Sequence, residues 1–187
     1  EILIDQNPID KINLNDLRSN IGYVPQEVFL FSETIANNIS FGLKESDVSK
    51  EVIEQAAKHA AVYDNIIEFP DQFETLVGER GITLSGGQKQ RVSIARAIIR
   101  KPQILIFDDC LSSVDTETEE EILKHLKIIM QDKTSIIISH RVSSVKHADH
   151  IIILDEGIVV EQGKHNYLID QKGIYFDLFK KQQLENS

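Results

Sequence analysis

Short runs of apolar, largely β-branched residues recur along the chain and predict β-strands. These runs cover residues 2–4, 21–24, 104–107, 135–138, 151–154 and 158–160. The third and fourth runs are almost wholly apolar, which is typical of strands buried in a parallel sheet. Residues 155–157 read Asp-Glu-Gly, so the last two strands are expected to form a hairpin at the sheet edge.

Apolar side chains at helical spacing lie between several of these strands. A helix over residues 116–130 is predicted by four of them, Ile122, Leu123, Leu126 and Ile129. Thr116 and Glu119 have the spacing of a capping box at its start. Because this helix joins two apolar strands, we expect a right-handed βαβ crossover. Further helices are predicted over residues 48–60 and 175–184, the first within a helical insert.

Charge and composition narrow the function classes. The chain has 187 residues, of which 30 are acidic and 20 basic, giving a formal net charge of −10. Non-specific binding to nucleic acid is therefore disfavoured, since no long basic run offsets this charge. The single cysteine, Cys110, cannot form an internal disulfide, which is compatible with a reducing cytosol. The apolar runs fall far short of the roughly 18 residues that a bilayer crossing needs.

Residues 84–88, Leu-Ser-Gly-Gly-Gln, precede a helical pattern. Taken alone, Ser85 with Gln88 indicates only a capping box. Gly86 and Gly87 remove Cβ atoms where the helix begins, so an anion can approach the free N–H groups and the positive end of the helix dipole. The start of this helix is therefore a candidate phosphate site.

Two acidic residues, Asp108 and Asp109, directly follow the apolar strand 104–107. Ligands of doubly wound sheets bind outside the carboxyl ends of the strands, so this pair points to a site there. Mg²⁺ is commonly held by one or two carboxylates and by substrate phosphates, which makes Asp108 the natural ligand. A structural or capping role fits the pair equally well. His140 ends the neighbouring strand and faces the same edge.

One part of a phosphate site is missing from the sequence. A P-loop reads G-x-x-x-x-G-K-[ST], but the Gly163–Lys164 step is followed by His165 and lacks the first glycine. The remaining motifs, taken in order, resemble the nucleotide-binding domain of ATP-binding cassette (ABC) transporters of the exporter type. The resemblance extends over essentially the whole chain, and the ordered set is far more specific than any single motif.

The resemblance assigns the family segments in chain order. They are the Q-loop at Gln26, the exporter segment (X-loop) at 77–81, the signature at 84–88, Walker B at 104–109, the D-loop at 112–115 and the switch histidine in 139–141. It implies ATP and Mg²⁺ as cofactors. The implied ATP-binding residues are Gln26, Ser85, Gly86, Gly87, Gln88 and Asp115. The implied metal ligands are Asp108 and Gln26, and the implied catalytic residues are Asp109 and His140.

The fold implied by the family is α/β, a P-loop NTPase-like sheet with a helical signature subdomain, here lacking the P-loop and the N-terminal part of the domain. The expected parts are a helical insert with the X-loop over about 27–84, the signature helix 85–101, the core sheet 102–164 and a C-terminal helical region 165–187. Since the Walker A loop of the family precedes the strand at 2–4, we expect that part before Glu1. We expect no ATPase activity from this chain alone.

The implied function is the ATP-hydrolysing engine of an exporter on the cytoplasmic face of the cell membrane. Its implied partners are a second nucleotide-binding domain, packed head to tail as a homodimer or heterodimer, and the transmembrane domain of the same transporter, with no nucleic acid. Two alternatives stay open, an ABC-type ATPase of DNA repair or chromosome maintenance and a non-catalytic nucleotide-sensing module. Asp109 stands where the family usually has Glu, so slow hydrolysis is expected unless a small backbone adjustment compensates.

Overall fold

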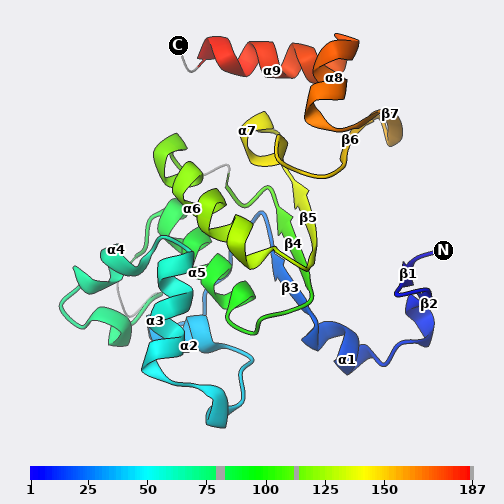
Figure 1. Cartoon of the computed structure of the whole chain (residues 1–187). Coiled ribbons are helices and arrows are strands. Elements are labelled where there is room, and N and C mark those ends of the chain that lie inside the picture. The colour runs from blue at the N-terminus through cyan, green and yellow to red at the C-terminus, as the bar shows by residue number, and fades with distance from the viewer. Residues whose placement is uncertain (79–82, 112–113, 186–187) are drawn as a thin grey trace. The chain divides into compact units, whose positions relative to one another are not determined.

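The computed structural model describes residues 1–78, 83–111 and 114–185, which fall into two compact units, Glu1–Ile138 and Ser139–Ser187. The strands of the first unit are β1 Leu3–Ile4, β2 Asn7–Pro8, β3 Ile21–Val24, β4 Ile104–Asp108 and β5 Thr134–Ile138 (Figure 1). Its α-helices are α1 Leu14–Ser19, α2 Ile35–Ser40, α3 Lys50–His59, α4 Tyr63–Ile67, α5 Gly86–Ile98 and α6 Thr116–Ile129. Short 3-10 helices cover Ile9–Lys11, Glu45–Asp47 and Gln72–Glu74.

A parallel sheet in the order β3-β4-β5 forms the centre of the first unit. Its register aligns Tyr23 with Ile106 and Ile106 with Ile136. The β4–α6–β5 segment is the predicted βαβ crossover, and the two strands pair in parallel as expected. Strands β1 and β2 instead pair with each other in an antiparallel ladder.

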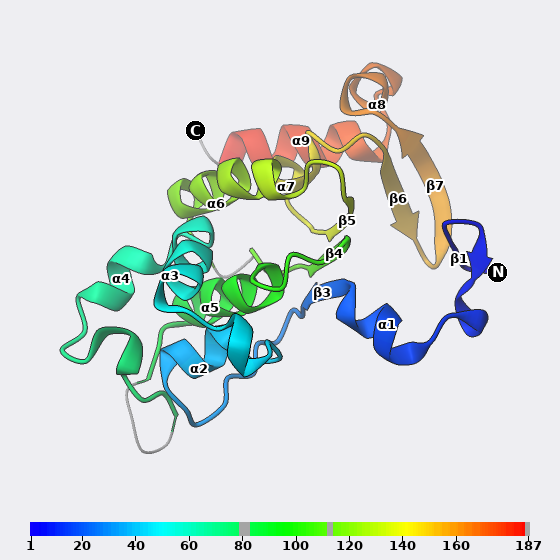
Figure 2. The same cartoon turned by 60° about the horizontal axis from the view of Figure 1, so that its bottom comes forward.

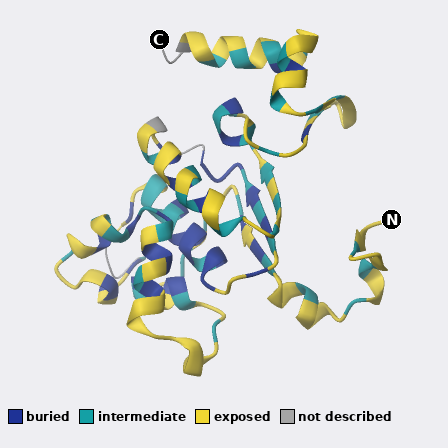
Figure 3. Cartoon of the chain, viewed as in Figure 1, coloured by how far each residue is buried: buried dark blue, intermediate teal, exposed yellow. Residues whose placement is uncertain are grey.

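The two faces of this sheet differ in burial. Leu105 and Phe107 point into the main core, which also contains Ile122 and Leu126 of α6. On the other face, Ile136 and Ile138 are 48% and 49% exposed. The described part of this unit thus covers the apolar strands mainly on one face, because its helices pack on that side. Figure 3 shows many of the buried residues on α5 and on the helices and strands next to it.

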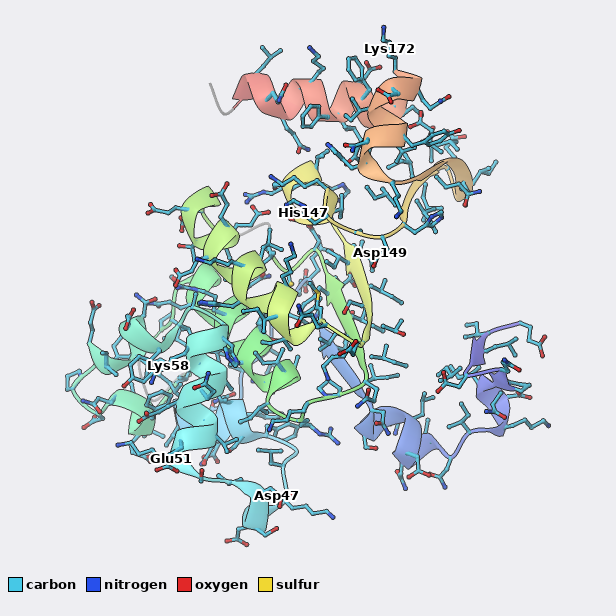
Figure 4. All side chains as sticks on the ribbon, in the orientation of Figure 1. Asp47, Glu51, Lys58, His147, Asp149 and Lys172 are labelled. Atoms are coloured by element: carbon cyan, nitrogen blue, oxygen red, sulfur yellow. The ribbon has the colours of Figure 1, made fainter. Side chains whose placement is uncertain are left out.

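Helix α5 is the central helix of this core. Figures 1 and 2 show it next to the sheet, and it contacts β3, α2 and α3. Gly22 permits the close approach of β3 to α5, because a Cβ added there would lie 2.6 Å from the carbonyl oxygen of Ala97. On the solvent side, Asp47, Glu51 and Lys58 mark the exposed surface of α3 and of the turn before it (Figure 4).

A buried polar cluster joins α2 to α5. Asn38 of α2 is fully buried, and its Oδ1 accepts hydrogen bonds from the Phe31 amide and from an Nη atom of Arg96, both at 2.9 Å. Arg96 also donates to the carbonyl oxygens of Asn38 and Phe29, and its guanidinium lies 5.5 Å from the centre of the Phe31 ring. Burial lowers the pKa of Arg96 from its ordinary value. Three oxygen atoms, two from backbone carbonyls and one from the Asn38 side chain, nevertheless accept hydrogen bonds from its guanidinium.

The second unit contains α7 Val142–Val145, β6 Ile151–Asp155, β7 Ile158–Gly163, α8 His165–Gln171 and α9 Ile174–Glu185. Strands β6 and β7 form the predicted hairpin, which pairs Asp155 with Ile158. Its small core consists of Val142, Ile151, Leu168 and Tyr175. Lys172, at the exposed turn between α8 and α9, has a left-handed backbone (Figure 4). Within the described ranges, no helix of either unit combines the length and apolarity that a bilayer crossing requires.

Candidate functional site

Two neighbouring strands bring the predicted polar residues together at the carboxyl edge of the sheet. Gln26 follows β3, while Asp108 ends β4 and Asp109 comes next. The Gln26 side-chain amide donates a long hydrogen bond of 3.4 Å to Asp109 Oδ2. Because β3 and β4 are adjacent and parallel, their carboxyl ends lie at the same edge of the sheet, where ligands of such sheets bind.

The two carboxylates have different surroundings. Asp109 is 8% exposed, its backbone amide donates to the Ile138 carbonyl at 2.8 Å, and its φ of +42° is one that Asp tolerates better than most residues. Asp108 is half-buried and accepts from the Tyr23 hydroxyl at 3.0 Å, a bond that raises the pKa of Tyr23. Burial, with the two acids nearby, raises the pKa of Cys110 to about 12. The edge is therefore a negatively charged, partly desolvated corner.

The donor atoms at this corner fit Mg²⁺. Asp108 offers carboxylate oxygens, and the Gln26 side chain, which donates through Nε2, retains its amide oxygen. Oxygen donors of this kind, completed by water and substrate phosphates, are the usual environment of Mg²⁺. No cluster of three or more His, Cys, Asp or Glu side chains suited to a metal occurs in the described part of the chain.

The predicted signature segment forms the start of α5. Ser85 is the N-cap residue, and the capping box is complete: Gln88 N donates to Ser85 Oγ at 3.2 Å, and Ser85 N donates to Gln88 Oε1 at 2.9 Å. These side chains therefore hold the helix start in place. Gly86 and Gly87 belong to the first turn, whose backbone N–H groups have no intrahelical acceptor. The N–H groups of Gly86 and Gly87 can therefore donate to an anion.

Arg91 of α5 lies near the predicted D-loop residue Asp115 and interacts with its charge. It donates to the carbonyl oxygens of Gly87 and Ala61, at 3.2 and 2.5 Å. Asp115 is the N-cap of α6 and accepts from Thr118 N at 2.9 Å, which, with the nearby Arg91, lowers the pKa of Asp115.

The prediction that Thr116 caps α6 is therefore wrong by one residue, because Asp115 takes that position. Ser112 and Ser113 of the predicted D-loop lie outside the described residues, as do residues 79–81 of the predicted X-loop.

Sequence reasoning missed Gln90, which links α5 to the edge. Gln90 is 4% exposed, and its Nε2 donates to the Gln26 backbone carbonyl at 2.9 Å. Its position was detectable, because Gln90 lies one turn before the buried Ile94 and is thus a polar residue on the apolar face of the helix. The same signal applies to the buried Asn38 of α2.

His140 belongs to the second unit, so its proximity to the carboxylates stays a prediction. The residue is exposed, and its backbone carbonyl accepts from Gln182 Nε2 at 2.7 Å. His147 and Asp149 lie in the connection between α7 and β6 (Figure 4), and His150 contacts Gln162 at 3.3 Å.

The sequence of this chain is similar to those of known ABC transporter proteins. The family model described as ABC transporter matches residues 1–112. An uncharacterised ABC transporter ATP-binding protein of Bacillus subtilis is 49% identical, over 97% of this chain and 31% of its own length. An ATP-dependent lipid A-core flippase of Pseudoalteromonas translucida is 44% identical over the same shares, 97% and 31%.

A solved structure gives the same comparison in three dimensions. A bacterial Atm1-family ABC exporter with ATP bound matches with a TM-score of 0.90 and 41% identity, covering 97% of this chain and 32% of that one. The chain thus spans about a third of the length of these proteins.

Proposed function

The chain belongs to the ABC transporter family, and on that premise we propose that it works as the ATP-binding and ATP-hydrolysing engine of an exporter. It would act with a second nucleotide-binding domain, packed head to tail, and with a transmembrane domain, at the cytoplasmic face of the membrane. The similar proteins include an exporter and a lipid A-core flippase, which favours transport over DNA repair.

The observation that carries this proposal is the convergence of Gln26, Asp108 and Asp109 at the carboxyl edge of the parallel sheet. Asp108 and the Gln26 amide oxygen would hold Mg²⁺, which supplies neutralisation of phosphate charge when it is bound. Asp109, buried beside Gln26, would orient the attacking water and accept its proton. His140 would contact the γ-phosphate from its own segment. Phosphoryl transfer depends mostly on such positioning and charge neutralisation.

The start of α5 would serve a different ATP molecule, the one held by the partner domain. Gly86 and Gly87 would bind its γ-phosphate through their first-turn N–H groups, and Ser85 and Gln88, whose own amides bond within the capping box, would complete this ATP-binding segment by keeping those groups aligned. Asp115 would contribute from the D-loop. Because the γ-phosphate is lost on hydrolysis, such contacts favour the closed dimer only while ATP is intact. Two-state closure of this kind can drive a transport cycle.

Asp109 sets the expected rate of the site built on this chain. Its carboxylate is shorter than that of Glu by one C–C bond, about 1.5 Å, and a displacement of that order can cost roughly 10²-fold in rate. In the complete transporter, Asp109→Glu should therefore raise single-turnover ATP hydrolysis at this site by roughly 10- to 100-fold. Asp64→Glu, on the exposed side of α4, is the matched control and should leave the rate unchanged.

No rise with Asp109→Glu would contradict the proposal that Asp109 limits the rate. ATP bound without turnover in both the parent and the Glu variant would instead favour the nucleotide-sensing module. For residues 1–187 alone we expect no ATPase activity, since the sequence contains no P-loop to hold the β- and γ-phosphates. Phosphate release above the protein-free blank by this purified chain would contradict that expectation.

A further inference from the structure

Gln182, on the C-terminal helix α9, holds the backbone on both sides of Arg141. Its Nε2 donates to the His140 carbonyl and its Oε1 accepts from the Val142 amide, both at 2.7 Å. We propose that Gln182 is a positioning residue for His140, so that α9 controls the geometry of the predicted switch histidine. This inference rests on the proposed function for the role of His140.

The bonding pattern requires a glutamine-like side chain. Arg141 is extended, with φ −96° and ψ 124°, so the carbonyl before it and the amide after it point to the same side. A primary amide carries one acceptor and one donor group, and it can pair with both as a neighbouring strand would. Gln182 thus holds the carbonyl of the peptide that follows His140, while the amide of the same peptide, Arg141 N, donates to Ser139 Oγ at 3.0 Å, and the two bonds together restrict the direction of the His140 Cα–Cβ bond.

The bond to Val142 also completes the start of α7. Val142 is the first residue of this helix and is buried, while the N-cap residue, Arg141, has no side-chain capping bond. The first amides of a helix need acceptors from outside it, and Gln182 supplies one from a position 40 residues further along the chain. Loss of Gln182 would leave a buried N–H group without its acceptor.

The N-terminal end of helix α9 is held in place by its own contacts, so the helix can fix the position of Gln182. The Glu161 carboxylate accepts from the amides of Ile174 and Tyr175 at the helix N-terminus, where a negative charge is stabilised. Gly173 permits this contact, because a Cβ there would lie 2.0 Å from Glu161 Oε1. Tyr175 is 1% exposed and bonds to His165 Nδ1 at 2.8 Å. Gln182 follows Tyr175 by two helical turns and lies on the same face of α9.

The test is a double-mutant cycle in the complete transporter. Gln182→Ala should lower the kcat for ATP hydrolysis by roughly tenfold or more, while KM changes less than about twofold, because positioning of a catalytic group fails without loss of binding. In a His140→Ala background the same change should have no further effect. Lys181→Ala, one residue away and exposed, is the control and should leave kcat unchanged. An equal loss of kcat with and without His140 would overturn the inference.

A second readout separates this inference from the role of His140. Hydrogen exchange in a peptide that covers residues 139–145 should speed up in Gln182→Ala and stay unchanged in Lys181→Ala, since Val142 N loses its acceptor. Unchanged exchange in Gln182→Ala would overturn the inference. If His140→Ala leaves turnover unaffected, the proposed role of His140 is wrong, and faster exchange still supports the positioning of its backbone by Gln182.

Discussion

Replacing Asn38 with leucine tests whether the buried polar cluster holds α2 against α5. Asn38 Oδ1 accepts from the Phe31 amide and from Arg96, and Nδ2 donates to the carbonyl oxygens of Phe31 and Thr34 at 3.0 and 3.1 Å. Leucine has nearly the same shape and no polar atom. The substitution therefore removes these bonds without opening a large cavity.

The size of the stability loss depends on which hydrogen-bond partners of Asn38 keep another partner after the substitution. The Phe31 carbonyl keeps the Glu33 amide at 2.8 Å, and the Thr34 carbonyl keeps the Asn38 amide at 2.9 Å. The Phe31 N–H and one N–H group of Arg96 lose the Asn38 acceptor. An unsatisfied buried donor costs about 1–3 kcal/mol, and a charged one more, so the free energy of unfolding should fall by about 3–5 kcal/mol. Typical domains have only about 5–15 kcal/mol in total.

Urea denaturation of the chain, followed by circular dichroism, measures this loss. With a denaturant slope of about 2 kcal/mol per molar urea, the midpoint should fall by roughly 2 M. Asn37→Leu is the matched control, because Asn37 is the exposed neighbour on α2 and should change stability by no more than about 0.5 kcal/mol. Equal midpoints for the two variants would refute the reasoning.

Three further predictions concern single residues. Cys110, with a pKa raised to about 12, should resist a maleimide at about pH 8 until urea unfolds the chain, and rapid labelling of the folded protein would contradict its burial. Burial, with His125 nearby, lowers the pKa of His59 below 6.5, so the folded state binds fewer protons than the unfolded state in this pH range. The free energy of unfolding should therefore fall as the pH is lowered from about 7.5 to about 5.5. His59→Gln should weaken that fall, and an unchanged slope would count against it. Gly22→Ala should destabilise the chain by about 1–3 kcal/mol, since its Cβ meets the Ala97 carbonyl, and an unchanged urea midpoint would disprove the close contact.

Local signals in the sequence were enough to predict most of the elements. The apolar runs at 21–24 and 104–107 mark β3 and β4, and the capping box of Ser85 and Gln88 forms as predicted. These features depend on spacing along the chain, which a sequence displays directly. Gln26 was placed in the site by the family resemblance alone, and it meets Asp109 because the parallel strands before the two residues end at the same edge of the sheet.

The features that sequence reasoning missed depend on contacts between distant residues. Arg96 meets Asn38 across 58 positions, and Gln182 meets Val142 across 40. Nothing in the local pattern selects such partners, although a polar residue on an apolar helix face marks the position. The apolar pattern alone does not locate the uncovered face at Ile136, because an apolar strand does not reveal whether one or both faces are packed.

Cross-linking from the start of α5 to ATP tests the central proposal most directly. In the complete transporter, Ser85→Cys would be exposed to an ATP analogue that carries a thiol-reactive group on its γ-phosphate, with Ser46→Cys as the exposed control. Buried Cys110 should contribute little background. We predict labelling of this chain at residue 85 that excess ATP abolishes. Labelling no stronger than at residue 46 would contradict the proposal that this helix start binds a γ-phosphate.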